Sequence, residues 1–336
     1  MRFFRPFLIC ISFAFFAIAC ENDAATDNTS DTDTATKPAA VTVPRFDRDS
    51  AMLYVKKQTE FGSRVPNSEA HQQAKDWMVE KLEAFGATVI EQEFTADLHT
   101  GESYEATNII GQYNPEHSKR VILAAHWDSR QVADHDPDVE DRDEPVMGAD
   151  DGASGVGVLL EIARQIQANP IDLGVDIILF DAEDNGDGSD NGDYKTWCLG
   201  SQYWARNLHT DGYDAKFGIL LDMVGGKNAR FTKDGISMAY APQVMNKVWK
   251  LAQNMGYGAY FVDVPTRELV DDHLFVNQIA KIPMIDIINR PADTETLFVK
   301  HWHTTEDTFD KIDARTLRAV GQVVLATIYR ESGGTF

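Results

Sequence analysis

The sequence predicts a single α/β domain with a central, mostly parallel, twisted sheet flanked by helices. Three observations lead to this prediction. Helical patterns alternate with short apolar runs from about residue 44 onward, with no long spacer between them. The run Ile177–Phe180 is rich in β-branched and aromatic residues and bounded by turn formers, which is typical of a strand buried on both faces. Acidic residues follow several such runs, at the carboxyl ends where open α/β sheets place their binding sites.

The first part of the domain is expected to contain two helices and three strands. In the second helix apolar residues recur at helical spacing, Asn67 or Ser68 can cap the start, and Gly86 can end it. A long polar, acid-rich loop, Trp127 to Met147, follows the third strand. The expected elements are helices Asp47–Phe61 and Ser68–Phe85, then strands Thr88–Phe94, Ala106–Gln112 and Val121–Ala125.

The second part continues the alternation and closes with a helix. A Gly- and Asp-rich loop, Asn185 to Asp193, follows the strand Ile177–Phe180. The other expected elements are helix Gly152–Gln167, helix Ser201–Leu208, strand Phe217–Leu221, helix Gln243–Met255, strand Met284–Ile288 and helix Ala314–Tyr329.

The composition limits the partners. The formal net charge of the 336 residues is −22 and no cluster of Lys and Arg occurs, which argues against nucleic acid or an anionic membrane surface as partner. No signal for oligomerisation is found, so we expect a monomer.

The first 43 residues are expected to lie outside the fold. Arg2 and Arg5 precede an apolar run, and Ala17-Ile18-Ala19-Cys20 supplies small residues before a cysteine, so residues 1–20 resemble a bacterial lipoprotein signal peptide. An ordinary cleaved secretory signal is the alternative. A lipid on Cys20 would anchor the chain in the cell envelope, facing the periplasm or on the cell surface. Residues 21–43 are acidic and lack aromatic residues, which predicts a flexible, disordered linker to the domain at 44–336.

Cysteine use excludes a disulfide inside the fold. Cys10 and Cys20 belong to the signal, which leaves Cys198 as the one thiol of the globular part.

Chemically active side chains collect after the predicted strands. His126 and Asp128 follow one strand, Asp181, Glu183 and Asp184 a second, and Asp222 a third; Asp151 opens a helix and His303 lies in a late loop. Carboxylate oxygens combined with a neutral imidazole suit Zn²⁺, and a catalytic zinc has three protein ligands with one open position. The pattern therefore predicts a metallohydrolase-like site.

Glu183 and Asp184 are neighbours, and in a regular strand they would face opposite ways. For both to reach one site the chain must already be turning, which we expect Asn185 and Gly186 to permit. One carboxylate can then hold a metal while the other stays free as a base. A solvated acidic loop is the alternative interpretation of this stretch alone.

These residues resemble the zinc-dependent M28 metallopeptidase superfamily over most of the chain after about residue 60. The motifs are His126-x-Asp128-Ser129, the run from Gly148 to Gly155, Glu183-Asp184, Asp222 and His303, in the order expected of that superfamily. Within it the chain is most similar to the bacterial lipoprotein branch of the glutaminyl cyclases, because of the run Trp197 to Ser201, Asp271-Asp272-His273 and Trp302-His303-Thr304.

The resemblance implies the roles of the site residues. It implies a zinc aminopeptidase-like fold and, most simply, one Zn²⁺ per chain, held by Asp151, Asp184 and His303. Glu183 would be the general acid/base, with Asp222 and Asp271 as a hydrogen-bonded acidic pair beside it. Trp197 and Trp302 would wall the substrate pocket. The implied reaction cyclises the N-terminal glutamine of peptides or proteins to pyroglutamate, releasing ammonia.

The chain departs from the animal cyclases at three points. It has Asp184 where they have Glu, Asp286 where they have His, and no counterpart of their disulfide. His126, which is a metal ligand in two-zinc aminopeptidases, is retained. The number of zinc ions therefore stays open.

Two other functions compete with the cyclase. A two-zinc aminopeptidase would place His126, Asp151, Asp184, Asp222 and His303 around two ions, with Glu183 activating water. A catalytically inactive peptide-binding lipoprotein on the same scaffold would be expected to lack a ligand or the base, and neither is missing.

Several residues also have purely structural interpretations. Asp151 could cap its helix, and Asp271-Asp272 could be the start of a helix with no other role. Trp197 and Trp302 could belong to the core. We expect His301 to be an ordinary loop histidine and Asp128 to orient a neighbour rather than bind metal.

Overall fold

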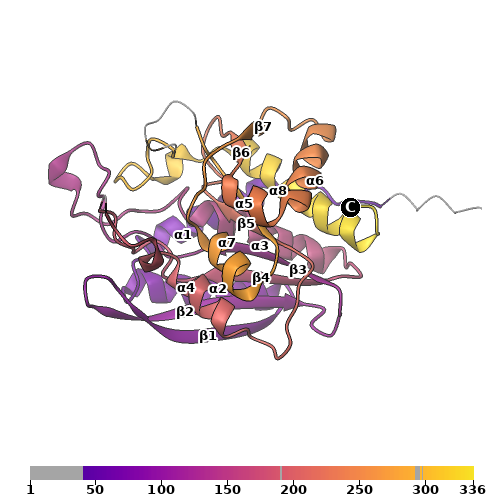
Figure 1. Cartoon of the computed structure of the whole chain (residues 1–336), viewed down its shortest axis with the longest axis horizontal. Helices are drawn as coiled ribbons and strands as arrows, with labels where there is room; N and C mark the ends of the chain where they lie inside the picture. Colours follow the sequence, from indigo (N-terminus) through magenta and orange to yellow (C-terminus); the bar gives the residue numbers. More distant parts are fainter. Residues whose placement is uncertain (1–40, 190, 292–295, 297) are drawn as a thin grey trace, which may run out of the picture. The chain divides into compact units, whose positions relative to one another are not determined.

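A six-stranded sheet runs through the chain in the order β1-β2-β4-β3-β5-β8 (Figure 1). The structure, a computed structural model, describes residues 41–189, 191–291, 296 and 298–336. The sheet strands are β1 (Thr88–Asp97), β2 (Ser103–Tyr113), β3 (Arg120–His126), β4 (Gly174–Phe180), β5 (Gly218–Asp222) and β8 (Met284–Ile288). A separate two-stranded sheet pairs β6 (Phe231–Lys233) with β7 (Phe261–Pro265).

Strands β4, β3, β5 and β8 are parallel, whereas β1 and β2 run antiparallel at one edge. After β3 the chain places β4 on one side and then crosses to place β5 on the other. Such a reversal opens a crevice past the carboxyl ends of the strands, which is where α/β sheets bind ligands. The predicted mostly parallel sheet in one α/β domain is confirmed, and the switch at β3 locates its crevice.

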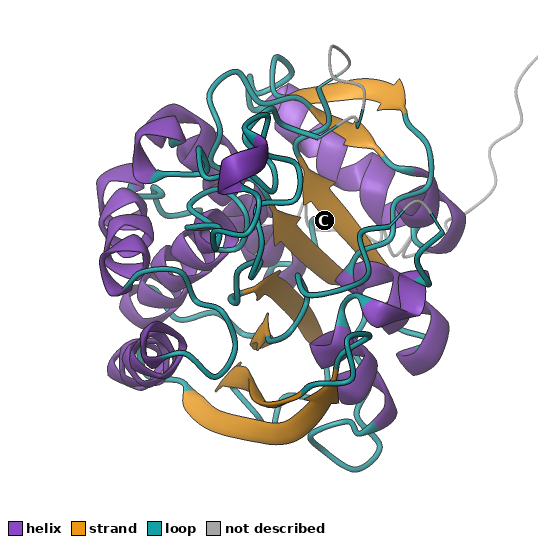
Figure 2. Cartoon of the chain, turned by 90° about the vertical axis from the view of Figure 1, so that its left-hand side faces the viewer, coloured by secondary structure: helices purple, strands orange, loops and turns teal. Residues whose placement is uncertain are grey.

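Helices cover both faces of the sheet, as Figure 2 shows with purple helices on either side of the orange strands. The helices are α1 (Arg48–Phe61), α2 (Glu69–Ala84), α3 (Ala153–Ala168), α4 (Leu199–Arg206), α5 (Gly235–Tyr240), α6 (Pro242–Asn254), α7 (Asp272–Phe275) and α8 (Ala314–Ser332). A π-helical turn, η3 (Val276–Ala280), continues α7. The short helices α5 and α7 and the strands β6 and β7 are absent from the sequence prediction, because elements of three to six residues leave too short a pattern.

Alternate residues of the central strands divide between two cores. Val121, Leu123 and Ala125 of β3 pack toward α1, α2, α3, α6 and α8, whereas Ile122 and Ala124 pack toward α4 and η3. Because successive side chains of a strand point to opposite faces, a strand that is apolar at every position must be covered twice. The two helical layers hold the strand ends in fixed positions.

The caps follow the sequence. Asp47 accepts hydrogen bonds from the first amides of α1, and Ser68 accepts one from His71 N in α2, so Ser68 rather than Asn67 is the cap. Each such cap is worth about 1 kcal/mol. Helix α4 begins at Leu199 and ends at Arg206, two residues earlier at each end than expected.

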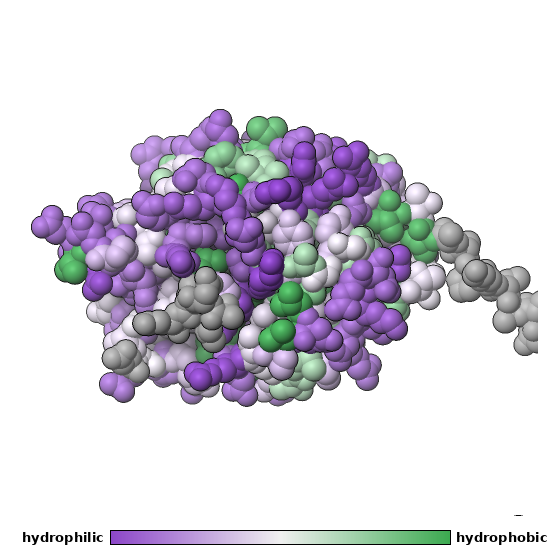
Figure 3. Space-filling view, turned by 90° about the horizontal axis from the view of Figure 1, so that it is seen from above, coloured by the Kyte–Doolittle hydropathy of each residue, from purple (hydrophilic) through white to green (hydrophobic). Residues whose placement is uncertain are grey.

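The molecular surface agrees with the acidic composition. The face in Figure 3 is mostly hydrophilic, with hydrophobic residues in small separate groups. Among the helices that the structure describes, none is long and apolar enough to cross a membrane. The predicted signal peptide and almost all of the predicted linker lie outside the described residues.

Candidate metal centre and active site

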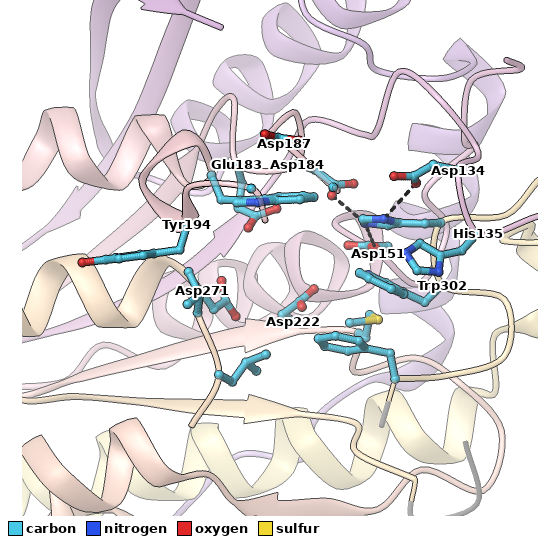
Figure 4. Close-up of a pocket in the computed structure, with 18 of the residues that line it drawn as sticks. Asp134, His135, Asp151, Glu183, Asp184, Asp187, Tyr194, Asp222, Asp271 and Trp302 are labelled. Carbon is cyan, nitrogen blue, oxygen red and sulfur yellow. Dashed lines mark hydrogen bonds and ion pairs between the residues drawn. The ribbon is translucent and has the colours of Figure 1, made fainter. Parts of the chain in front are cut away.

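The candidate site lies past the carboxyl ends of β3, β4 and β5. His126 is the last residue of β3, Asp222 is the last residue of β5, and Glu183 and Asp184 follow β4 by a few residues. Asp151 precedes α3, and His303 comes from the loop before α8. All eight predicted site residues line one cavity of about 350 Å³: Asp151, Glu183, Asp184, Trp197, Asp222, Asp271, Trp302 and His303. Figure 4 shows the carboxylates of several of them turned toward its interior.

A turn at Ala182 brings Glu183 and Asp184 to the same cavity. Ala182 has a φ of 52°, in the left-handed region that non-glycine residues rarely adopt. The side chain of Asp128 accepts hydrogen bonds from the backbone amides of Glu183 and Asp184, at 3.1 Å each. The chain therefore turns before Glu183, and the expected turn at Asn185 and Gly186 is corrected to Ala182. The prediction that Asp128 orients its neighbours is confirmed.

Asp151, Asp184 and His303 form a buried group whose donor atoms all lie within 4.8 Å of one another. His303 Nε2 lies 2.9 Å from Asp184 Oδ1 and 3.9 Å from Asp151 Oδ2. Asp184 Oδ2 is buried without a hydrogen-bond partner among the described residues, and such an atom costs free energy unless something binds it. Two carboxylates and one imidazole are a donor set that zinc accepts, so the residues fit the ion.

His126, Asp151 and Asp222 form a second buried group of the same kind. His126 Nε2 lies 3.0 Å from Asp151 Oδ1 and 3.3 Å from Asp222 Oδ1. Asp151 belongs to both groups, so its two oxygens face two neighbouring positions. The donor geometry accommodates one ion or two.

Asp151 is held by a network behind the cavity. Its amide and that of Asp150 donate to the two carboxylate oxygens of Asp307, at 3.0 and 2.9 Å. Helix α3 has Gly152 as its N-cap and no side-chain cap, so Asp151 is not a capping residue. His301, expected to be an ordinary loop histidine, contacts Asp150 Oδ2 at 3.0 Å and belongs to this network.

Glu183 has the surroundings of a proton-transfer group. Burial raises its pKa well above the ordinary value; the nearby His126 opposes this shift, and the negative charges of Asp184 and Asp271 add to it. The Cys198 thiol donates to Glu183 Oε1 at 3.2 Å, and the Cys198 amide donates to the Glu183 carbonyl at 2.9 Å. Sequence reasoning missed this contact, because it regarded Cys198 only as a residual thiol.

Asp222 and Asp271 lie in the same cavity but are not hydrogen-bonded to each other. Asp271 Oδ1 accepts from the Asp272 amide as the N-cap of α7, and its Oδ2 has no partner among the described residues. Burial and the charge of Asp151 raise the pKa of Asp222 well above its usual range. The implied hydrogen-bonded pair is therefore replaced by two separate buried carboxylates, and Asp271 both begins a helix and lines the site.

The two tryptophans are half-buried and flank His303. The Trp302 ring stacks on the His303 imidazole with centroids 3.8 Å apart, and Trp197 does so at 5.8 Å. Gly186 packs under Trp197, because a Cβ at that position would lie 2.3 Å from the ring. Trp197 and Trp302 are therefore cavity walls rather than core residues.

Comparison with known proteins places this site in a family. A family model described as Peptidase family M28 matches residues 108–328, which include all eight predicted site residues and the turn at Ala182. The chain belongs to peptidase family M28. The predicted membership of the superfamily is thereby confirmed.

Solved structures similar to this M28 chain carry two kinds of description. The crystal structure of Bacteroides thetaiotaomicron glutaminyl cyclase bound to N-acetylhistamine is 50% identical, with a TM-score of 0.84 over 86% of this chain and 99% of that one. A structure described as a leucine aminopeptidase precursor from the same species is also 50% identical, with a TM-score of 0.83 over 86% and 99%.

More distant relatives divide in the same way. Aminopeptidase YwaD of Bacillus subtilis is 27% identical over 258 residues, 74% of this chain and 50% of that protein, so the chain spans about half its length. The glutaminyl-peptide cyclotransferase of Gloydius blomhoffii is 24% identical over 292 residues, 78% of this chain and 75% of that protein.

Proposed function

We propose that this chain is a glutaminyl-peptide cyclotransferase, a zinc-dependent acyltransferase that converts the N-terminal glutamine of peptides or proteins to pyroglutamate and releases ammonia. One observation carries the proposal. Glu183 and the group of Asp151, Asp184 and His303 share one tryptophan-walled cavity, in a chain half identical to a glutaminyl cyclase along 86% of its length.

The reaction needs positioning more than a strong nucleophile. The α-amine attacks the γ-carbonyl carbon of the same residue, a C–N bond forms, and the bond to the side-chain nitrogen breaks. Holding the two groups together can contribute about 7–11 kcal/mol to lowering the barrier. Trp197 and Trp302 form the cavity walls that confine the folded glutamine side chain and exclude water, whose attack would compete.

Glu183 would move the proton. Its carboxylate takes a proton from the attacking amine and returns that proton to the leaving nitrogen, so that ammonia departs and the carboxylate is restored. A pKa raised by burial favours a group that acts first as base and then as acid. We propose that Asp222 and Asp271, which line the same cavity, bind the substrate amine and the leaving nitrogen.

The bound metal would be one Zn²⁺ per chain, held by Asp151, Asp184 and His303. Its chemistry is Lewis-acid polarisation of the γ-carbonyl oxygen. The two aspartates neutralise the charge of the ion, and the imidazole completes three protein ligands, as in other catalytic zinc sites.

A direct assay tests the activity. The purified protein is incubated with a Gln-initiated peptide, and we expect the peptide to lose the mass of ammonia while an Ala-initiated control stays intact. Release of free N-terminal amino acids with no cyclised product would contradict the proposal.

A two-zinc aminopeptidase is the second candidate, favoured by the additional group His126, Asp151 and Asp222 and by the relatives described as aminopeptidases. The metal content discriminates between the two. Two tightly held ions per chain, together with release of amino acids, would favour the aminopeptidase.

We also propose that the chain is a lipoprotein of the cell envelope, anchored through Cys20 and acting as a monomer on peptide N-termini. The support is the basic start, the apolar run and the small residues before Cys20. In cells supplied with labelled fatty acid, the full chain should become labelled and Cys20→Ala should not. If Cys20→Ala still became labelled, the lipid would be attached to another residue and the proposed anchor at Cys20 would be wrong.

A further inference from the structure

The loop 127–147 carries a pair between a buried arginine and a half-buried aspartate beside the metal group. Arg130 Nε and Nη2 donate to the two carboxylate oxygens of Asp134, at 2.8 and 2.6 Å. The Arg130 side chain is only 4% exposed. A bidentate pair of this kind holds both side chains in one orientation.

Asp134 Oδ1, which accepts from Arg130 Nε, also faces His303. Asp134 Oδ1 lies 3.3 Å from His303 Nδ1, and this nitrogen has no hydrogen bond to any other residue that the structure describes. In Figure 4 a dashed line joins Asp134 to the His303 ring. His303 Nε2, in turn, is the nitrogen that lies against Asp184. The two ring nitrogens thus have separate partners, Asp134 on one side and the metal group on the other.

Arg130 also fixes the other parts of the site. Its Nη1 donates to the carbonyl of Asp184 at 2.9 Å, and its guanidinium lies over the Trp197 ring, 4.7 Å from the centroid. One arginine therefore contacts a metal-group residue, a cavity wall and, through Asp134, the histidine.

We infer that Asp134 and Arg130 are positioning residues: Asp134 holds the His303 ring with Nε2 facing the metal, and Arg130 holds Asp134 together with the Asp184 segment and Trp197. This inference rests on the proposed zinc site. A carboxylate on the second ring nitrogen sets the tautomer and raises the basicity of a histidine ligand, and removing it typically weakens metal binding 10–100-fold. The loop is then a fixed wall of the site.

The test is the zinc dissociation constant, measured by competition with a chromophoric chelator on the folded, purified protein. We expect Asp134→Ala to weaken zinc binding 10–100-fold. Asp134→Asn retains an oxygen that can accept from Nδ1 but loses the charge, so we expect a smaller loss. If Asp134→Ala binds zinc within twofold of the parent, the inference is wrong; should that variant not fold, unchanged affinity in Asp134→Asn overturns it equally.

A buried arginine–aspartate pair on the central sheet is the matched control. Arg120 and Asp176 form a bidentate pair at 2.7 and 2.9 Å, at the amino ends of β3 and β4. Asp176→Ala should lower the melting temperature and leave zinc affinity unchanged. If it weakens zinc binding as much as Asp134→Ala does, the effect is general destabilisation, and no positioning role remains.

Two further variants separate the explanations. His135 forms another group with Asp134 and His303 whose donor atoms lie close enough to hold a metal. If His135→Ala weakens zinc binding as much as Asp134→Ala does, the metal binds at that group and the inference is overturned. Arg130→Lys keeps the positive charge but loses the planar guanidinium that donates two hydrogen bonds to Asp134. We expect it to lower kcat by a larger factor than it raises KM. Equal factors in kcat and KM would contradict the positioning role of Arg130. Zinc binding without cyclisation would refute only the proposed function.

Discussion

The two ends of the parallel strands differ in how completely their buried polar groups are paired. At the amino ends, Arg120 and Asp176 are bidentate, Arg120 Nη1 also donates to the carbonyls of Pro115 and His117, and Asp176 further accepts from Gln112. At the carboxyl ends, buried atoms of Asp184, Asp271, Asp272 and His126 have no hydrogen-bond partner among the described residues. Both regions are charged and buried, but only at the amino ends is the charged pair complete.

Backbone strain shows the same contrast. Four of the non-glycine residues with positive φ lie around the candidate site: Ala182, Cys198, Met223 and His303. Each such residue costs on the order of 1–3 kcal/mol and persists only where the surroundings impose it. A region that retains unpaired charges and strain is organised to bind something, whereas a region that pairs its charges is organised to stay folded.

The comparison predicts the largest loss of activity at His303. In His303→Ala the metal group loses its imidazole, so zinc affinity should fall and cyclisation should drop to background at zinc concentrations that saturate the parent. His117→Ala, a histidine near the amino ends, is the control and should retain both. Full activity in His303→Ala would remove the residue from the metal centre.

Glu183→Gln should keep zinc and lose roughly 10²–10⁴ in turnover, because the proton-transfer group is gone while the ligands remain. Glu331→Gln, a buried glutamate that pairs with Lys119 and Lys216, is the control and should affect stability alone. The measurements are turnover of a Gln-initiated peptide and metal content. Near-normal turnover in Glu183→Gln would exclude Glu183 from the mechanism.

The opposite outcome is expected at the amino ends. Asp176→Ala leaves the Arg120 guanidinium buried without its partner, which should lower the free energy of unfolding by about 3–5 kcal/mol. Denaturant unfolding measures this loss. Turnover of the folded variant should stay at the parental level, and a catalytic defect larger than the loss of folded protein would break the contrast between the two ends.

Gly186 tests the wall of the cavity. Gly186→Ala places a methyl group against Trp197, and a misplacement of about 1 Å near a site can cost as much as about 10²-fold in rate. Gly258→Ala, where a Cβ meets nothing closer than Gln253 at 3.6 Å, is the matched control. Unchanged kcat/KM in Gly186→Ala would show that the position of Trp197 does not matter.

The smallest effects should appear in the pH dependence. Activity should rise as the substrate α-amine, with a pKa of about 7.7–8.0, loses its proton, and a flat profile from about pH 6 to 8.5 would contradict amine attack.

Stability should instead respond at alkaline pH. Burial raises the pKa of Tyr329, whose hydroxyl donates to the Asn169 carbonyl before β4, to about 12. Unfolded tyrosine has a pKa of about 10, so the folded state retains its proton longer. Its contribution is therefore present below about pH 10 and is lost as pH rises toward about 12. Tyr329→Phe should weaken this alkaline loss in thermal melts; an identical loss would assign it to other groups.

Much of the fold and the members of the site could be predicted from the sequence. The apolar strands β3, β4, β5 and β8 and the caps Asp47 and Ser68 carry local signals, and the acids after the strands follow from the rule for parallel sheets. The turn at Ala182 could not be predicted, because alanine rarely adopts positive φ. The Cys198 thiol on Glu183 and the Arg130–Asp134 pair beside His303 join segments whose mutual approach leaves no sequence pattern.

By itself the sequence determined the alternation of helices and buried strands, the acidic character of the chain and the residues able to hold zinc, because periodicity and residue chemistry are local properties. Only the tertiary structure decided that Asp222 and Asp271 remain unpaired with each other, that Asp151 faces two donor groups, and that His303 lies between Asp134 and Asp184. Those facts depend on the angles at which separate elements meet, and these angles are set by the packing of two helical layers against one twisted sheet.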